Sequence, residues 1–155
     1  MRVEKGERRV SPFLVPMMMA NAAGAAVSMR HGFRGPAETI CTACAAATHA
    51  IGHAARLIAW GRCDAVVTGG AESAGTITAI AGFANMTALS TTGVSMPFDA
   101  ARDGFVFGEG AAVLVLERLD LAVARGARIL GEVLGSASNA DAHHITAPSP
   151  GGTGA

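Results

Sequence analysis

Apolar and polar positions along the chain alternate between stretches with helical spacing and stretches rich in β-branched residues. Residues 45–60 are rich in alanine, and their larger side chains recur at helical spacing, which predicts a helix that ends at Gly61. Residues 17–30 and 76–85 predict two further helices, and residues 119–125 predict a short one. The remaining side chains of the helix over residues 45–60 are so small that this helix could be buried on all sides.

Strands are predicted between these helices. Short stretches enriched in β-branched and apolar residues indicate strands at residues 38–42, 64–68, 105–107, 111–116 and 127–136, with Gly69 and Gly70 closing the second of them. Serine, threonine, glycine and proline between residues 89 and 104 predict a loop and a polar turn, and residues 138–155 also read as a loop. Because strands and helices alternate, the predicted fold class is α/β.

Composition and charge narrow the functional classes. The chain has 155 residues, half of them apolar, and 12 basic residues balance 12 acidic ones. Nucleic-acid-binding proteins usually carry an excess of basic residues, and this chain has a net charge of zero. We therefore expect no nucleic-acid partner. Polar residues interrupt each apolar stretch before about 18 residues, so no membrane span is expected either. Three cysteines do not indicate a disulfide framework, which favours a cytoplasmic protein.

Cys41 and Cys44 form a Cys-x-x-Cys spacing where a predicted strand meets the alanine-rich helix. One interpretation is a redox pair, which this junction permits. A second is a metal site completed by His143 and His144, although those lie about a hundred residues away and a second Cys-x-x-Cys is lacking. A third is that both cysteines are small buried apolar residues. The spacing alone leaves these alternatives open.

Cys44 by itself supports a sharper hypothesis. A thiol at the start of a helix lies near free N–H groups and the positive end of the helix dipole, which favours the nucleophilic thiolate. The Cys44 N–H could also stabilise an oxyanion formed on attack. His49 and His53 follow on the same helix and are expected to be structural. His144 lies in a loop rich in turn residues, where functional residues often occur.

Two acidic positions are interpreted as structural. Glu109 lies between two glycines and is expected to be a buried, hydrogen-bonded acid. Arg102 and Asp103 are expected to form an ion pair in the polar turn. The glycines around these positions do not match a phosphate-binding loop, because neither Gly-x-x-x-x-Gly-Lys-Ser/Thr nor Gly-x-Gly-x-x-Gly occurs in this context.

The segment around Cys44, Gly-Pro-Ala-Glu-Thr-Ile-Cys-Thr-Ala-Cys-Ala-Ala-Ala-Thr-His-Ala-Ile at residues 35–51, resembles the active-site signature of the β-ketoacyl-acyl-carrier-protein synthases. Further motifs follow in the family's order and extend the resemblance over essentially the whole chain. They include Val-Thr-Gly-Gly-Ala-Glu at 67–72, Arg-Asp-Gly-Phe-Val-Phe-Gly-Glu-Gly-Ala at 102–111 and His-Ile-Thr-Ala-Pro at 144–148. The most similar subgroup is the type II, chain-elongating synthases.

The resemblance implies a thiolase-like fold with layered α-β-α-β-α halves, usually in a homodimer. It implies a condensation in which Cys44 takes an acyl chain from acyl carrier protein, and malonyl-acyl-carrier-protein then loses CO₂ and attacks the acyl-enzyme. By motif, the Cys44 N–H is half of the oxyanion hole, and Phe83 lines the acyl pocket. Thr146 contacts the pantetheine arm, and His144 is a tunnel histidine. Neither a metal nor a cofactor of the enzyme's own is implied, since the carrier protein brings its phosphopantetheine.

The sequence also departs from the family. The Asn-Ala-His-Gly-Thr and Lys-x-x-x-Gly-His motifs of the catalytic histidines and the Gly-Phe-Gly-Gly loop do not occur in it. Residues 1–155 are therefore expected to be a partial ketosynthase domain, the end of an N-terminal half and the start of a C-terminal half, which is inactive and folds poorly alone. Two alternatives are a thiolase-type acyltransferase and a non-catalytic subunit that shapes a pocket or dimerises.

Overall fold

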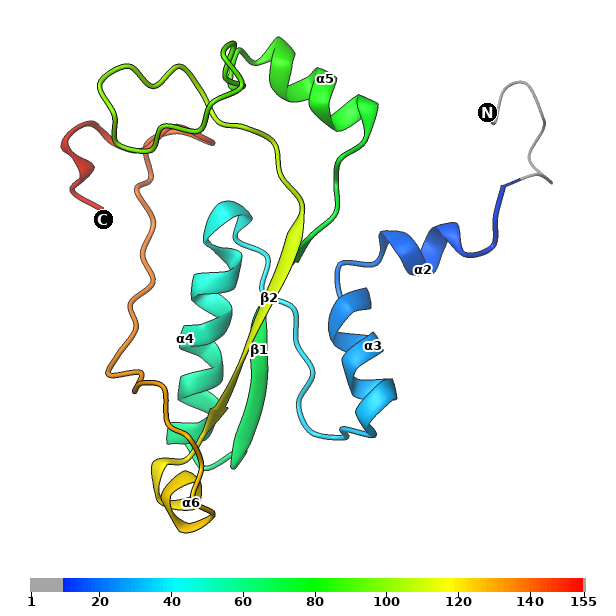
Figure 1. Ribbon diagram of the computed structural model, residues 1–155, viewed down its shortest axis with the longest axis vertical. Helices are drawn as coiled ribbons and strands as arrows, with labels where there is room; N and C mark the ends of the chain where they lie inside the picture. The colour runs from blue at the N-terminus through cyan, green and yellow to red at the C-terminus, as the bar shows by residue number, and fades with distance from the viewer. Residues whose placement is uncertain (1–9, 155) are drawn as a thin grey trace. The chain divides into compact units, whose positions relative to one another are not determined.

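The computed structural model describes residues 10–154, in which helices and strands are mixed as the sequence predicts (Figure 1). The chain divides into two units, each described here by itself. One holds residues up to 68 together with those from 114 onward, and the other holds residues 69–113. The elements in chain order are α2 (Leu14–Met18), α3 (Ala22–His31), η2 (Ala43–Ala45), α4 (Ala46–Ala59), β1 (Ala65–Glu72), α5 (Ile77–Asn85), β2 (Gly110–Glu117), α6 (Leu119–Ala124) and η3 (Pro150–Gly152).

Helix α4 confirms the helix predicted over the alanine-rich stretch, and it has a defined end. Gly61 adopts a φ of +68°, in the left-handed region that favours glycine. Its N–H donates to the Ile58 carbonyl at 2.9 Å, and the Arg62 N–H donates to the Leu57 carbonyl at 2.9 Å. These two bonds form a Schellman motif and satisfy carbonyls that the end of a helix otherwise leaves free.

Strands β1 and β2 pair in a two-stranded sheet. The Arg118 N–H, just after β2, donates to the carbonyl of Asp64, just before β1, at 3.0 Å, so the two strands are antiparallel. β1 does not close at its glycines as predicted. It runs through Gly69, whose φ is +150° and where a Cβ atom would lie 2.8 Å from the Val113 Cα. The missing side chain lets the partner strand approach and the strand continue.

Four predicted elements differ in the structure. The helix predicted over residues 17–30 is broken, because Met19 has an extended backbone and Asn21 precedes the second helix, α3. Residues 38–42 and 127–136 form no strand, and the sheet that the structure describes within residues 10–154 pairs β1 with β2 alone. β propensity alone cannot hold an extended segment in a ladder without a partner. Phe105 likewise forms only an isolated bridge, with Leu89.

The predicted ion pair between Arg102 and Asp103 is wrong. The Asp103 carboxylate instead accepts hydrogen bonds from the Ser90 hydroxyl at 2.6 Å and from the Thr91 N–H at 2.8 Å. Arg102 donates to a backbone carbonyl at 2.7 Å. The Asp103 carboxylate therefore binds backbone N–H and hydroxyl donors of the same loop. These bonds do not require a long arginine side chain to be ordered.

Glu109 is hydrogen-bonded as predicted, but it is exposed and not buried. Its Oε1 accepts from the Gly75 N–H at 2.7 Å, which ties two distant positions of the second unit together. Each of these two acids, Asp103 and Glu109, thus fixes a loop through its backbone.

The described residues leave much of their apolar surface exposed. Among residues 10–154, Ala54 and Ala122 are the buried apolar residues other than glycine. No large side chain in this range is fully buried. None of the helices formed by residues 10–154 has the length and apolar character needed to cross a membrane.

Candidate active site

Cys44 lies in a sharp turn between an extended segment and helix α4. Ala43 has a left-handed backbone with a φ of +49°, which is strained for a residue that carries a Cβ atom. Ala43 is also the first residue of the 3₁₀ turn η2, in which the Ala45 N–H donates to the Thr42 carbonyl at 3.1 Å. The extended segment therefore passes into the helix through this turn, and the exposed Cys44 lies two residues before α4 begins.

The position of Cys44 has the electrostatics expected for a nucleophile. α4 has 14 residues and no acidic residue in its first turn, so its N-terminal dipole is not compensated there. Within residues 10–154, the Cys44 N–H donates to no backbone carbonyl outside its helix. This N–H and the thiol leave from the same residue, so a carbonyl attacked by the sulfur would have a donor close to its developing negative charge.

Two side-chain pairs hold the segment before the cysteine against α4. His49 Nδ1 shares a hydrogen bond of 2.7 Å with Thr42 Oγ1, and His53 Nε2 lies 2.6 Å from Glu38 Oε2. The histidines are four residues apart and thus lie on one face of the helix. Their structural role was predicted, but their partners were not. The equal spacing of four between Glu38 and Thr42 is the signal in the sequence that could have pointed to them.

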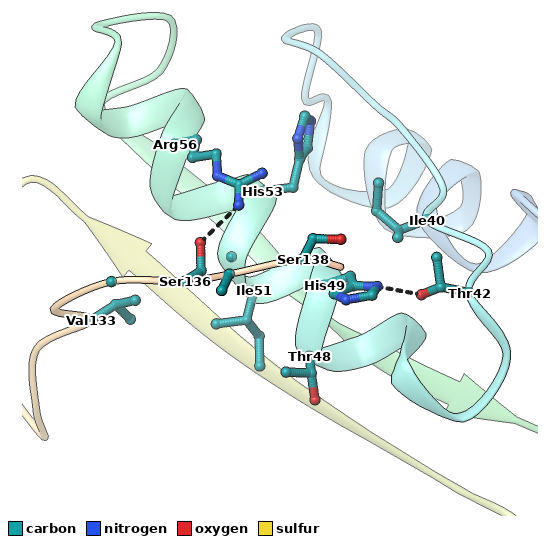
Figure 2. A pocket seen from close by; sticks show the side chains of 13 residues that line it. Ile40, Thr42, Thr48, His49, Ile51, His53, Arg56, Val133, Ser136 and Ser138 are labelled. Atoms are coloured by element: carbon teal, nitrogen blue, oxygen red, sulfur yellow. Dashed lines mark hydrogen bonds between the residues drawn. The ribbon is translucent and has the colours of Figure 1, made fainter. Parts of the chain in front are cut away.

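A pocket of about 330 Å³ opens on this face of α4 (Figure 2). Figure 2 shows His49 and Thr42 at one end and Arg56 with Ser136 at the other. Arg56 Nη2 donates to Ser136 Oγ at 3.2 Å. Cys44 does not line the pocket, and neither do the other site residues predicted from the sequence. The lining residues are Ile40, Thr42, Thr48, His49, Ile51, Gly52, His53, Arg56, Val133, Gly135, Ser136, Ala137 and Ser138.

His144 and Thr146 are brought together in one short loop. The N–H groups of Thr146 and Ala147 both donate to His144 Nδ1, each at 3.1 Å. Nδ1 must therefore be the unprotonated nitrogen, and the neutral ring carries its proton on Nε2. Both side chains are exposed. Among the side-chain hydrogen bonds of residues 10–154, none joins this loop to Cys44.

Phe83 belongs to the second unit and lies in α5. Its ring is 5.1 Å from that of Phe105, centroid to centroid, at 84° in an edge-to-face arrangement. The Phe107 ring lies 6.1 Å from it. Edge-to-face pairs of this kind contribute about 0.5–1.5 kcal/mol beyond the area they bury. The phenylalanine singled out by the resemblance is thus held in an aromatic cluster, with 36% of its surface still exposed.

The metal interpretation has no support in the described residues. No three His, Cys, Asp or Glu side chains between residues 10 and 154 are gathered so that they could hold an ion, and Cys41, Cys44, His143 and His144 are therefore not brought together. Cys41, Cys44 and Cys63 are all free thiols in the structure, so the redox pair is not present as a disulfide.

Comparison with known proteins finds one family and many relatives. Residues 1–122 match the family described as "Beta-ketoacyl synthase, N-terminal domain". The chain is 51% identical over 158 residues to a 3-oxoacyl-[acyl-carrier-protein] synthase 2 of Rhizobium meliloti (strain 1021), with 98% of this chain covered. It spans 38% of the length of that relative.

Solved structures agree with the sequence comparison. A β-ketoacyl synthase from Burkholderia phymatum STM815 superimposes with a TM-score of 0.87 at 38% identity, covering 96% of this chain and 38% of that one. A type II polyketide synthase acyl-carrier protein in complex with its ketosynthase bound to the hexaketide matches with a TM-score of 0.73 at 30% identity, over 77% of this chain and 31% of that one. The predicted thiolase-like α/β fold is confirmed for the part that this chain covers.

Proposed function

Because this chain belongs to the β-ketoacyl synthase family, we propose that its protein catalyses the condensation of an acyl thioester with malonyl-acyl-carrier-protein. The products are a 3-ketoacyl-carrier-protein and CO₂, as in the elongation of fatty acids. The observation that carries the proposal is the position of Cys44, exposed in a strained turn at the N-terminus of α4.

In the first stage, the Cys44 thiolate attacks the carbonyl carbon of an acyl thioester. A new C–S bond forms, and the carbonyl electron pair moves onto oxygen, where the Cys44 N–H stabilises it. Collapse of this intermediate breaks the original C–S bond, and the pantetheine thiolate leaves and takes up a proton. The acyl chain is then held on the enzyme as a thioester of Cys44.

In the second stage, the malonyl group loses CO₂. The electron pair of the broken C–C bond stays on the remaining thioester, which thereby becomes an enolate. Its carbon attacks the acyl carbonyl on Cys44, a new C–C bond forms, and the C–S bond to Cys44 breaks. The Cys44 thiolate is thereby restored. The helix dipole that favours the thiolate at the start of the cycle also favours its departure at the end.

The remaining predicted site residues have supporting roles in the proposal. His144 would present its Nε2–H as a hydrogen-bond donor, because Nδ1 is taken by backbone N–H groups. Thr146, two residues on, would contact the pantetheine arm, and Phe83 would line the acyl pocket within its aromatic cluster. The phosphopantetheine belongs to the carrier-protein substrate.

Acyl carrier protein is the proposed partner, and one similar ketosynthase has been solved with an acyl-carrier protein bound. We also propose that the protein is a homodimer and acts in the cytoplasm. These proposals concern the whole protein. The chain described here spans 38% of the length of the Rhizobium meliloti relative.

The test is to trap the acyl-enzyme of the full-length protein. Incubation with an acyl thioester should add one acyl group, and peptide mass spectrometry should place it on Cys44. Cys44→Ala should abolish both acylation and condensation, whereas Cys41→Ala, three residues earlier, should retain both. Acylation of Cys41 or Cys63, or condensation by the Cys44→Ala variant, would overturn the proposal. A reversible Cys41–Cys44 disulfide at equal reactivity would support the redox alternative.

A further inference from the structure

We propose that Thr42 and His49, with Glu38 and His53 as a second pair, are positioning residues that hold the turn of Cys44 at the start of α4. This inference rests on the proposed function only in taking Cys44 as the nucleophile. We refer to the two pairs together as the histidine clamp.

The clamp acts on a part of the backbone whose conformation is not fixed by sheet hydrogen bonds and is strained at one residue. Residues 38–42 form no strand in the described chain, so a sheet ladder does not fix them. Ala43 then carries a strained φ of +49°, which persists only if the residues around it impose it. The Thr42 hydroxyl, one residue before Ala43, bonds His49 at 2.7 Å, and Figure 2 shows this bond reaching across from the extended segment to the helix.

The second pair repeats the contact one helical turn further along. Glu38 Oε2 lies 2.6 Å from His53 Nε2, and their side chains are 53% and 29% exposed. A partly exposed pair of this kind is screened by solvent and contributes little to stability by itself. Its effect is geometric, because two attachment points four residues apart fix the direction of the segment as well as its position.

The histidines reach back from within α4, so they tie the segment to the same helix whose dipole acts on the thiol. Loosening either pair lets the turn relax away from its strained conformation. The thiol then spends less time at the helix N-terminus, where the free N–H groups and the helix dipole favour attack by the sulfur. The clamp residues touch neither Cys44 nor a substrate in this argument, and they act through the backbone.

The experiment measures how fast a small alkylating agent, iodoacetamide, modifies each cysteine of the full-length protein. Thr42→Val removes the hydroxyl but keeps the branched shape, and Thr42→Ser is its matched control. Cys63, beyond the far end of α4 and outside the clamped segment, serves as the internal reference in the same sample. We expect Thr42→Val to lower the Cys44 rate relative to Cys63 by about three- to tenfold, the equivalent of one hydrogen bond, and Thr42→Ser to restore it.

A parallel series changes the histidine. His49→Leu removes the ring nitrogen, whereas His49→Asn keeps a polar atom near the position of Nδ1, so the first should lower the Cys44 rate and the second should preserve most of it. In steady-state condensation of an acyl thioester with malonyl-acyl-carrier-protein, Thr42→Val should lower kcat and leave KM unchanged, as expected for a residue that does not bind substrate.

Two results would overturn the inference. One is a Cys44 rate in Thr42→Val that changes no more than the Cys63 rate. The other is an equal effect of Thr42→Val and Thr42→Ser. If the alkylation rates of all cysteines in Thr42→Val rise together, that variant is unfolding. The Cys44 alkylation rate of His49→Asn then distinguishes a positioning role from a merely structural one. Failure of acylation in the unaltered protein would refute the proposed function but leave the alkylation test of the clamp intact.

Discussion

At the scale of single residues, Asp103 shows how one carboxylate organises a loop. It accepts bonds from the hydroxyls of Ser90 and Thr91 and from the N–H groups of Thr91 and Thr92. The Ser90 hydroxyl also accepts from the Gly93 N–H at 3.1 Å, so the carboxylate and one serine together fix four consecutive residues. The sequence predicted a loop here but assigned Asp103 the wrong partner.

These donors, the Ser90 hydroxyl first and the Thr91 groups next, hold the pKa of Asp103 well below its ordinary value of 3.8. Between the folded and unfolded values the unfolded chain binds more protons, so stability rises with pH there. The contribution of Asp103 is complete above the unfolded value and is lost as pH falls through the folded value.

We therefore expect Asp103→Asn to lower the free energy of unfolding of the full-length protein by a constant amount above about pH 5, and by less as pH falls below about 4. Urea denaturation at a series of pH values measures this difference. Thr91→Val should lower the free energy of unfolding with the same pH dependence but by a smaller amount. Thr91→Ser keeps the hydroxyl and should not lower it. A difference that grows toward acid pH would contradict the assignment.

At the scale of elements, the end of α4 illustrates what local sequence can decide. Gly61 was predicted to stop the helix, and its φ of +68° with the two bonds of the Schellman motif confirms the prediction. The turn needs nothing from distant residues, because every group that it uses lies within five positions.

Replacing Gly61 with alanine should lower the free energy of unfolding by about 1 kcal/mol, because a Cβ atom is strained in the left-handed region. Space is not the cause, since a Cβ atom at Gly61 would meet nothing within 4 Å. Gly61→Asn should be milder, because asparagine tolerates this conformation better than alanine. Denaturation of the two variants beside the parent checks the order, and equal stability of all three would refute it.

The elements that sequence could not predict depend on distant partners. Residues 38–42 and 127–136 have β-branched residues typical of strands, yet a strand exists only where a neighbour completes its hydrogen bonds. The same limit holds for the site. Cys44 is a candidate nucleophile by its motif and its predicted helix start, whereas the bond from Thr42 to His49 joins an extended segment to a helix face and requires the fold to be known.

At the scale of the whole molecule, exposed apolar surface dominates. Phe98, Ile145 and Leu134 are 100%, 95% and 92% exposed. Each buried large apolar side chain contributes about 1.5–3 kcal/mol relative to an exposed one, and here few of them contribute.

We expect the 155-residue chain, produced by itself, to bind a hydrophobic dye strongly and to unfold without a cooperative transition. Dye fluorescence and a calorimetric scan measure the two properties, with the full-length protein as the control. A monodisperse sample of the chain with a sharp thermal transition and little dye binding would contradict the expectation.

The exposed surface also has a consequence for biosynthesis. At 5–20 residues per second, a ribosome needs roughly 8 to 30 s to make a stretch of this length. During that time apolar residues such as Leu130 and Leu134, 83% and 92% exposed, face solvent and the macromolecules around the ribosome. Chaperones that recognise extended apolar segments therefore compete with aggregation for this region while the protein is still being translated.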